Sequence, residues 1–177
     1  MADMASTLQK FRSQDGRTLL EHSRESPLLV VFLRHLGCTF CREACSDLAE
    51  QRDRIETAGA RIVLVGMTPD AALSKFCTRY GLADVLRVSD PSAELYEAFE
   101  LKRGTLGQLF GLRVWVRGFV AGVLRGHWVG RLQGDGFRMP GAFLVKDGGI
   151  VRAYRHLTAA DRPDYCALAG PTREIAS

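Results

Sequence analysis

The chain has 177 residues, of which 46% are hydrophobic and 25% are charged, and its formal net charge is +4. This length fits one domain with a single buried core, and no apolar run approaches the roughly 18 residues that span a membrane. We therefore expect one domain over residues 1–177, with residues 1–26 as an N-terminal extension. The first residues lack the charged, apolar and small-residue order of a secretory signal, so a cytoplasmic location is expected.

The cysteines point to redox chemistry. Their number is odd, five, which argues against a framework of disulfides, and a reducing cytosol disfavours such a framework as well. Catalytic or redox-active cysteines agree better with this odd number than structural disulfides do. Three of the five lie in one stretch, residues 28–45, which reads LLVVFLRHLGCTFCREAC.

This stretch predicts a strand followed by a helix. The uninterrupted apolar run at residues 28–33 is typical of a strand buried on both faces. After Arg34 and a loop containing Gly37, helix-forming residues continue to about Ala58, which places Cys38 in the first turn of a helix. Unpaired N–H groups and the positive end of the helix dipole favour a thiolate there, and the pKa of a thiol in a CxxC setting falls from about 8.5 to roughly 3.5–7.5.

Strands and helices alternate further along the chain. We expect a strand at 61–66, a helix from 68 or 69 to about 81, a short strand at 85–88 and a helix at about 93–101. This order implies a parallel sheet with right-handed crossovers. Two apolar runs around Asp147-Gly148-Gly149, at 141–146 and 150–154, predict a closing antiparallel hairpin, and a short helix and a frayed tail follow Pro163.

The positive charge is concentrated in residues 101–134, which contain six Lys or Arg and no Asp or Glu. Glycines recur there every four residues, at Gly118, Gly122, Gly126 and Gly130, which would give a helix a narrow groove. We expect a basic helical insertion at 102–134, packed on the sheet with its arginines facing water. One alternative is a lid or a membrane-surface element that gathers lipophilic or anionic substrates. The alternative function is a non-catalytic module that binds a membrane surface or a protein partner through this basic segment. Nucleic-acid binding is not expected, because no fold signature for it accompanies the basic residues.

Together these elements describe an α/β, thioredoxin-like fold, in which helices flank a central mixed sheet, a CxxC begins the first sheet-flanking helix and a proline precedes the penultimate strand. The runs FLRHLGCTFCREACSDLAE and GDGFRMPGAFLVKDGGIVRAYRH, with ADRPDY near the end, resemble the peroxiredoxin-like 2 group in the AhpC/TSA branch of thioredoxin-like proteins. The resemblance extends from about residue 28 to residue 168.

The resemblance implies a thiol-dependent oxidoreductase that acts on small-molecule peroxides, lipid peroxides or endoperoxides, or protein disulfides. It implies no bound cofactor, and electrons from thioredoxin or glutathione with NADPH as the remote source. Cys38 matches the N-terminal, more exposed cysteine of the family and would attack as a thiolate, Cys41 would resolve the product, and Arg34 would add positive charge. Pro140 matches the cis-proline of thioredoxins, so the Met139–Pro140 bond is expected to be cis. Direct NADPH binding is not predicted, since no glycine motif for a nucleotide is present.

Some positions depart from the pattern of true peroxiredoxins. Those enzymes place Thr or Ser three residues before the peroxidatic cysteine and Pro four residues earlier, whereas Cys38 is preceded there by His35 and Val31. Pro140 stands where peroxiredoxins have an Arg, although Arg138 lies two residues away. These departures favour dithiol–disulfide exchange over peroxide reduction.

The cysteines also allow other interpretations. A zinc site would use Cys38, Cys41 and Cys45, with His35 or Cys77 as the fourth ligand. Three cysteines along one helix make a poor tetrahedral cage, so this interpretation is weaker than redox function. Cys45 is a candidate reserve resolving thiol, whereas Cys77 and Cys166 are expected to be small apolar residues of the core.

Overall fold

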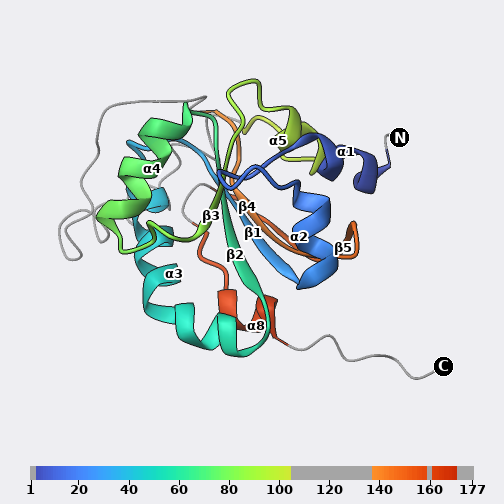
Figure 1. The fold of residues 1–177 in the computed structure, drawn as a ribbon. Helices are drawn as coiled ribbons and strands as arrows, with labels where there is room; N and C mark the ends of the chain where they lie inside the picture. The colour runs from blue at the N-terminus through green and yellow to red at the C-terminus, as the bar shows by residue number, and fades with distance from the viewer. Residues whose placement is uncertain (1–2, 105–136, 159–160, 171–177) are drawn as a thin grey trace.

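The computed structural model describes residues 3–104, 137–158 and 161–170 (Figure 1). In chain order the elements are α1 (Met4–Lys10), α2 (Leu19–Glu25), β1 (Leu28–Leu33), α3 (Thr39–Thr57), β2 (Arg61–Gly66), α4 (Asp70–Arg79), β3 (Leu86–Ser89), α5 (Glu94–Ala98), β4 (Gly141–Lys146), β5 (Gly149–Arg155) and α8 (Tyr165–Ala169). The expected basic insertion at 102–134 lies, beyond its first three residues, outside the described residues.

One five-stranded sheet organises the chain, with the strand order β3-β2-β1-β4-β5. Strands β1, β2 and β3 pair in parallel, whereas β4 pairs antiparallel with both β1 and β5. The β4–β5 turn contains Asp147 and Gly148, which both have positive φ, of 50° and 82°, as two-residue hairpin turns require. The predicted parallel crossovers, the closing hairpin and the mixed sheet are therefore confirmed.

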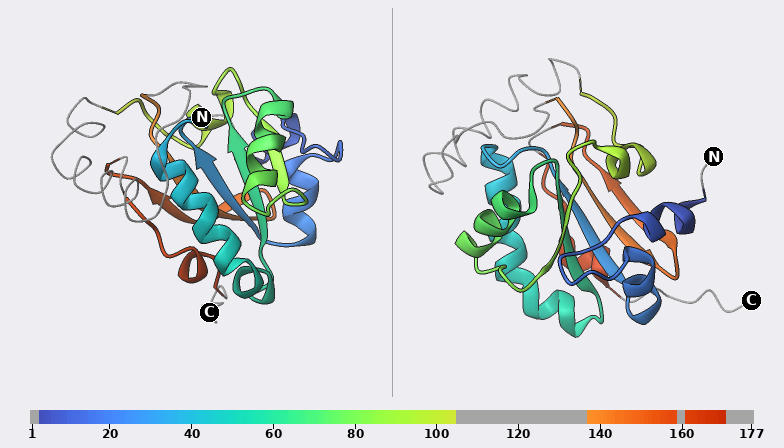
Figure 2. Two further views of the ribbon diagram at one scale, coloured as in Figure 1. Left: turned by 90° about the vertical axis from the view of Figure 1, so that its left-hand side faces the viewer. Right: turned by 45° about the horizontal axis from the view of Figure 1, so that its top comes forward.

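Helices cover both faces of this sheet (Figure 2). Successive side chains of a strand point to opposite faces, and in β1 all six residues are buried. Leu29, Val31 and Leu33 pack in a cluster with residues of α3, α4 and α8. The alternate β1 residues pack in a second cluster with residues of α1, α2 and α5. This double burial is the physical reason for the uninterrupted apolar run in the sequence.

The N-terminal residues take part in this packing. Helix α2 starts with a capping box, in which Thr18 and Glu21 satisfy each other's backbone N–H groups. Leu8 of α1 and Leu19 of α2 have no exposed surface, and both belong to the cluster that covers Phe32. Residues of the expected N-terminal extension thus cover one face of the sheet.

Tyr96 of α5 connects the ends of the two central parallel strands. Its buried hydroxyl lies 2.6 Å from the carbonyl oxygen of Leu33 and 3.0 Å from that of Val65, and it donates its hydrogen to them. Its ring packs edge-on against Phe32, with 4.8 Å between the ring centroids. Since Leu33 is the last residue of β1, Tyr96 fixes the point at which the chain leaves the sheet toward the two cysteines.

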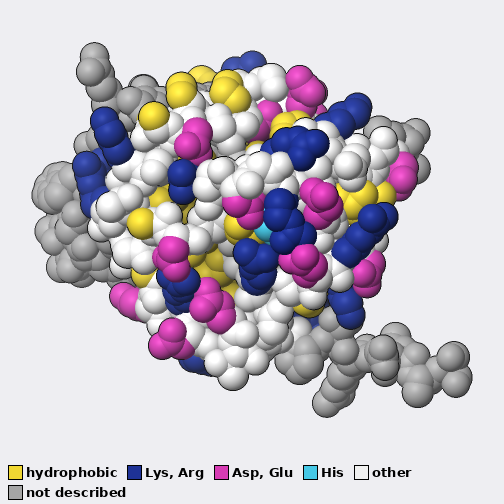
Figure 3. Space-filling view, viewed as in Figure 1, with side chains coloured by type: hydrophobic (Ala, Val, Ile, Leu, Met, Phe, Trp, Pro, Cys, Tyr) yellow, Lys and Arg dark blue, Asp and Glu magenta, His cyan; other side chains and the backbone are white. Residues whose placement is uncertain are grey.

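The described surface mixes the two signs of charge. In Figure 3, acidic and basic side chains alternate over the face shown. Ion pairs such as Arg52–Asp84 and Arg87–Asp70 contribute to this pattern. No helix in the described ranges is long and apolar enough to cross a membrane.

Replacing Tyr96 by Phe tests its role at the strand ends. Tyr96→Phe removes the hydroxyl that donates to the Leu33 and Val65 carbonyls, and the loss of a buried hydrogen bond of this kind costs about 1–3 kcal/mol. Urea unfolding followed by circular dichroism measures the change in the free energy of unfolding. Tyr154→Phe is the matched control, since Tyr154 is 36% exposed and its substitution should cost within about 0.5 kcal/mol. Equal midpoints for the two variants would contradict the assignment.

Candidate active site

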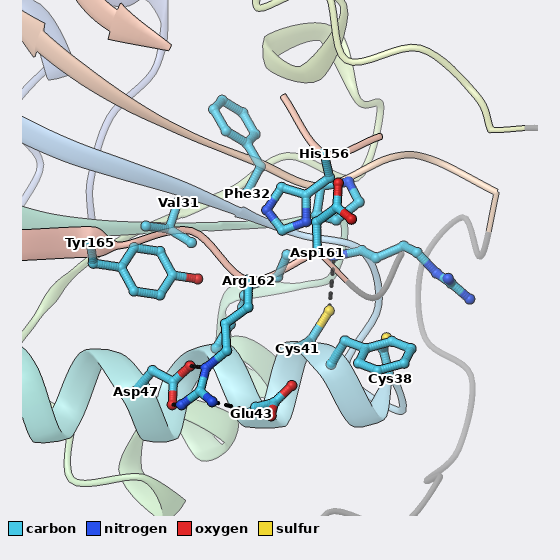
Figure 4. A pocket seen from close by; sticks show the side chains of 15 residues that line it. Val31, Phe32, Cys38, Cys41, Glu43, Asp47, His156, Asp161, Arg162 and Tyr165 are labelled. Atoms are coloured by element: carbon cyan, nitrogen blue, oxygen red, sulfur yellow. Dashed lines mark hydrogen bonds and ion pairs between the residues drawn. The ribbon is translucent and has the colours of Figure 1, made fainter. Parts of the chain in front are cut away.

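The CxxC motif lies where β1 gives way to α3. Cys38 is the N-cap residue of α3, and its backbone N–H closes a turn onto the carbonyl of His35 at 2.9 Å. The predicted position of Cys38 at the start of a helix is therefore confirmed. Cys41 follows one turn later, and its sulfur accepts a hydrogen bond of 3.1 Å from the backbone N–H of Arg34 (Figure 4).

The two thiols have opposite acidities. The pKa of Cys38 falls from its ordinary value of 9.0 to about 6, because the Cys41 thiol donates a hydrogen bond to it and the positive charge of Arg34 lies nearby, against the opposing effect of burial. The N–H groups of Phe40 and Cys41 add to this effect, although neither makes a capping bond of ordinary geometry. The hydrogen bond to Cys38 and burial raise the pKa of Cys41 well above 9.0. At neutral pH, Cys38 is thus the thiolate and Cys41 the thiol.

Burial does not distinguish the two cysteines. The resemblance implied a more exposed Cys38, but the exposed fractions are 6% for Cys38 and 4% for Cys41. The difference in acidity therefore comes first from the hydrogen bond between the two thiols, and the positive charge of Arg34 lowers the pKa of Cys38 further.

Arg34 and His35 lie buried beside the cysteines. Arg34 is 8% exposed, and its Nη2 atom lies 3.4 Å from Nε2 of His35. Burial, with the positive charge of Arg34, lowers the pKa of His35 to about 4, so that its imidazole is neutral at pH 7. Arg34 thus supplies positive charge near Cys38, in the position that the sequence suggested.

Pro140 also lies by the cysteines, but its peptide bond differs from the expectation. No peptide bond among the described residues is cis, so the expected cis Met139–Pro140 bond is wrong. The trans form is intrinsically favoured by about 0.5–1 kcal/mol for X–Pro bonds, and the N–H of Met139 is held by the carbonyl of Lys102 at 3.0 Å. Arg138 donates to the Leu101 carbonyl and pairs with Glu97, and it does not line the cavity that holds the cysteines.

A narrow cavity joins these residues, and we call it the cysteine cavity (Figure 4). Its volume is about 20 Å³, close to the smallest space that holds one water molecule. Besides apolar side chains, its walls contain Arg34, Cys38, Cys41, Glu43, Asp47, Pro140, His156, Asp161, Arg162 and Tyr165.

The sequence did not predict the ion-paired residues that line the cysteine cavity. Arg162 makes a bidentate ion pair with Asp47 and lies 3.8 Å from Glu43, and both carboxylates are buried on α3. The spacing of Glu43 and Asp47, one turn apart on the CxxC helix, is the sequence signal that would have placed them on one face. His156 also lines the cavity, and burial lowers its pKa to about 4.

The remaining cysteines are less suited to exchange. Cys45 has no exposed surface, and burial raises its pKa well above 9.0, which disfavours a role as a reserve resolving thiol. Cys77 is buried too, and burial raises its pKa to about 11. Cys166 is partly exposed and contacts Gln51. Within the described residues, no group of three or more His, Cys, Asp or Glu is arranged to hold a metal ion, so the zinc interpretation gains no support.

Comparison with known proteins identifies the family. A sequence model of the AhpC/TSA antioxidant enzyme family matches residues 47–159, which is more than half of the chain, and the chain belongs to this family. The match begins after Cys38 and Cys41, so the roles of these two residues depend on the geometry of the site.

Particular relatives agree with this assignment. The chain is 28% identical over 151 residues to Peroxiredoxin-like 2C of Bos taurus, which covers 80% of this chain and 66% of the relative. It is 29% identical over 136 residues to Peroxiredoxin-like 2C of Homo sapiens, covering 72% and 60%. The chain thus spans just under two thirds of the length of these curated relatives.

Solved structures share the fold. Peroxiredoxin Q of Xanthomonas campestris superposes with a TM-score of 0.58 at 20% identity, over 82% of this chain and 78% of that chain. A PrxQ mutant of Xylella fastidiosa gives 0.60 at 16% identity, over 89% and 82%. The predicted thioredoxin-like fold and the AhpC/TSA resemblance are confirmed.

Alkylation tests the acidity of Cys38. Because iodoacetamide reacts with thiolates, the alkylation rate of Cys38 in the reduced protein should rise with pH around a midpoint near 6 and level off above pH 7. Peptide mapping by mass spectrometry separates Cys38 from Cys166, which is partly exposed. A midpoint above pH 8 for Cys38 would show an ordinary thiol.

The Arg162 ion pairs are testable by unfolding. Arg162→Met leaves the buried Asp47 without its bidentate cation, and we expect a loss of about 2–4 kcal/mol in the free energy of unfolding, because Arg162 itself is partly exposed. The matched control is Arg52→Met, which removes surface pairs with Asp84 and Glu56 and should cost less than about 1 kcal/mol. Similar losses in the two variants would argue against a buried network.

Proposed function

We propose that the protein is a thiol-dependent oxidoreductase that cycles Cys38 and Cys41 between dithiol and disulfide. One observation carries the proposal: Cys38 at the N-cap of α3 and Cys41 one turn later line the same cavity as the buried cation Arg34. In this arrangement the pKa of Cys38 is lowered and that of Cys41 is raised. This is the arrangement needed by an attacking and a resolving cysteine. Membership in the AhpC/TSA antioxidant enzyme family supports the same chemistry.

In exchange with a disulfide substrate, the Cys38 thiolate attacks one sulfur and the other leaves as a thiolate. Cys41 then loses its proton and attacks Cys38, which releases the second substrate thiol and forms the Cys38–Cys41 disulfide. With a peroxide, Cys38 takes one oxygen atom and becomes a sulfenic acid, and an alcohol or water leaves. Attack by Cys41 then releases water and forms the same disulfide.

Disulfide exchange is the better supported branch. Within the described residues, no Ser or Thr lines the cysteine cavity, whereas peroxiredoxins place such a hydroxyl near the peroxidatic cysteine. His35 stands at that position with a neutral imidazole. Two thiols from thioredoxin or glutathione would return the pair to the dithiol state, without a bound cofactor.

Cysteine variants test the cycle. The reduced protein is mixed with insulin, hydrogen peroxide or a lipid hydroperoxide, and substrate loss and protein thiols are followed under a thioredoxin or glutathione reducing system. Cys38→Ser should reduce every activity to the background of a free thiol, because the attacking thiolate is gone. Without the reducing system, Cys41→Ser should consume one equivalent of substrate and then stop, with Cys38 trapped as a mixed disulfide or sulfenic acid.

The control for these assays is Cys166→Ser, which removes a partly exposed thiol outside the cysteine cavity and should keep wild-type rates. Wild-type rates for Cys38→Ser with all three substrates would refute the mechanism. Activity with peroxide alone would assign the peroxidase branch instead.

A further inference from the structure

Within the part of the chain that the structure describes, Arg34 is a buried cation without a carboxylate partner. It is 8% exposed, and its Nε atom is buried with no hydrogen-bond acceptor. None of the ion pairs among the described residues includes Arg34, and its side-chain contact is the neutral ring of His35 at 3.4 Å. Buried charges are normally paired, because an unpaired charge loses its hydration without compensation.

The acidic groups of the cysteine cavity are paired elsewhere. Asp47 and Glu43 face Arg162. Asp161 accepts hydrogen bonds from the backbone N–H groups of Leu157 and Thr158 and from the Thr158 hydroxyl. Among the described residues, the anion left to balance Arg34 is the Cys38 thiolate, which shares the cavity with it.

Formation of the disulfide removes this anion. With glutathione disulfide as the oxidant, the Cys38 thiolate, the Cys41 thiol and one proton give the Cys38–Cys41 disulfide and two molecules of glutathione. The two electrons pass from the protein sulfurs to glutathione disulfide. After this step Arg34 faces a neutral disulfide, and the N-terminus of the 19-residue helix α3 has lost its negative partner too.

We propose that the positive charge of Arg34 stabilises the dithiol form of the Cys38–Cys41 pair, in which Cys38 carries the opposite charge. The Cys38–Cys41 disulfide is then a strong oxidant. A low-molecular-weight thiol of the glutathione class is sufficient to reduce it. The proposal rests on the proposed CxxC cycle and specifies its reductant. It follows from the general rule that a disulfide becomes more oxidising when its reduced form is stabilised. Arg34 acts here as a positioning residue, since it does not exchange electrons itself.

Equilibration in glutathione redox buffers tests the proposal. The full chain is incubated at a series of ratios of glutathione to glutathione disulfide, quenched with acid and alkylated, and the Cys38–Cys41 disulfide is quantified by mass spectrometry. Arg34→Met should make the disulfide at least about tenfold more stable relative to the dithiol, which corresponds to about 30 mV for two electrons. Arg34→Lys keeps the charge and should remain closer to wild type than to Arg34→Met.

The matched control is Arg54→Met, which removes the same charge from an exposed position near the C-terminal end of α3 and should leave the equilibrium unchanged. A disulfide that forms with the same equilibrium constant in wild type and Arg34→Met would overturn the role of Arg34 and leave the cycle intact. Equal shifts in Arg34→Lys and Arg34→Met would overturn the explanation by the positive charge of Arg34. No Cys38–Cys41 disulfide in any buffer would refute the proposed function itself.

Unfolding of the two redox forms gives a second readout that does not require the Arg34 variant to fold. If the folded state disfavours the disulfide, then formation of the disulfide lowers the free energy of unfolding. Most disulfides instead raise the free energy of unfolding. The oxidised wild-type protein should therefore unfold at a lower urea concentration than the reduced protein. A higher midpoint for the oxidised form would overturn the proposal.

Discussion

The confinement of strand β1 is the constraint on which the site depends. This strand pairs with β2 and β4 and is covered by helices on both faces, so its last residue, Leu33, has little freedom to move. The Tyr96 hydroxyl holds the Leu33 carbonyl as well. From there the chain passes through Arg34 to Cys38 in one short loop and enters α3. A guanidinium, a helix N-terminus and two thiols are therefore brought into the same small volume.

This confinement gives two identical functional groups different chemical roles. A negative charge on Cys38 is stabilised by the Cys41 thiol, by Arg34 and by N–H groups at the start of α3. The same charge makes a second thiolate at Cys41 unfavourable, in addition to the cost of burial. The two thiols titrate as one unit, in which the first proton is lost easily and the second with difficulty. The positive charge of Arg34 and the N–H groups of Phe40 and Cys41 thus favour the anion on Cys38, the cysteine proposed to attack.

The sequence predicted the parts of the molecule that local signals specify. The doubly buried β1, the helix beginning at Cys38 and the β4–β5 hairpin follow from an apolar run, a helix-start pattern and a glycine turn. The ion pairs of Arg162 could not be predicted in this way, because Asp47 lies 115 residues earlier and carboxylates on a helix usually face water. The position of Pro140 was predicted but its isomer was not. The cis and trans forms of an X–Pro bond differ by only about 0.5–1 kcal/mol, so the surrounding structure decides between them.

Membership in the AhpC/TSA family does not by itself select between the two branches of the proposed chemistry, since both begin with a thiolate in a narrow cavity. They differ in the group that leaves. A peroxide releases an oxygen anion that must take up a proton, whereas a disulfide releases a thiolate, which is a weaker base and leaves with less assistance. Near Cys38, His35 has a pKa of about 4 and is therefore a poor proton donor at pH 7, while Arg34 supplies charge without a transferable proton. The site thus assists formation of the attacking anion more than protonation of a leaving oxygen, and this asymmetry favours disulfide exchange on a fold shared with peroxiredoxins.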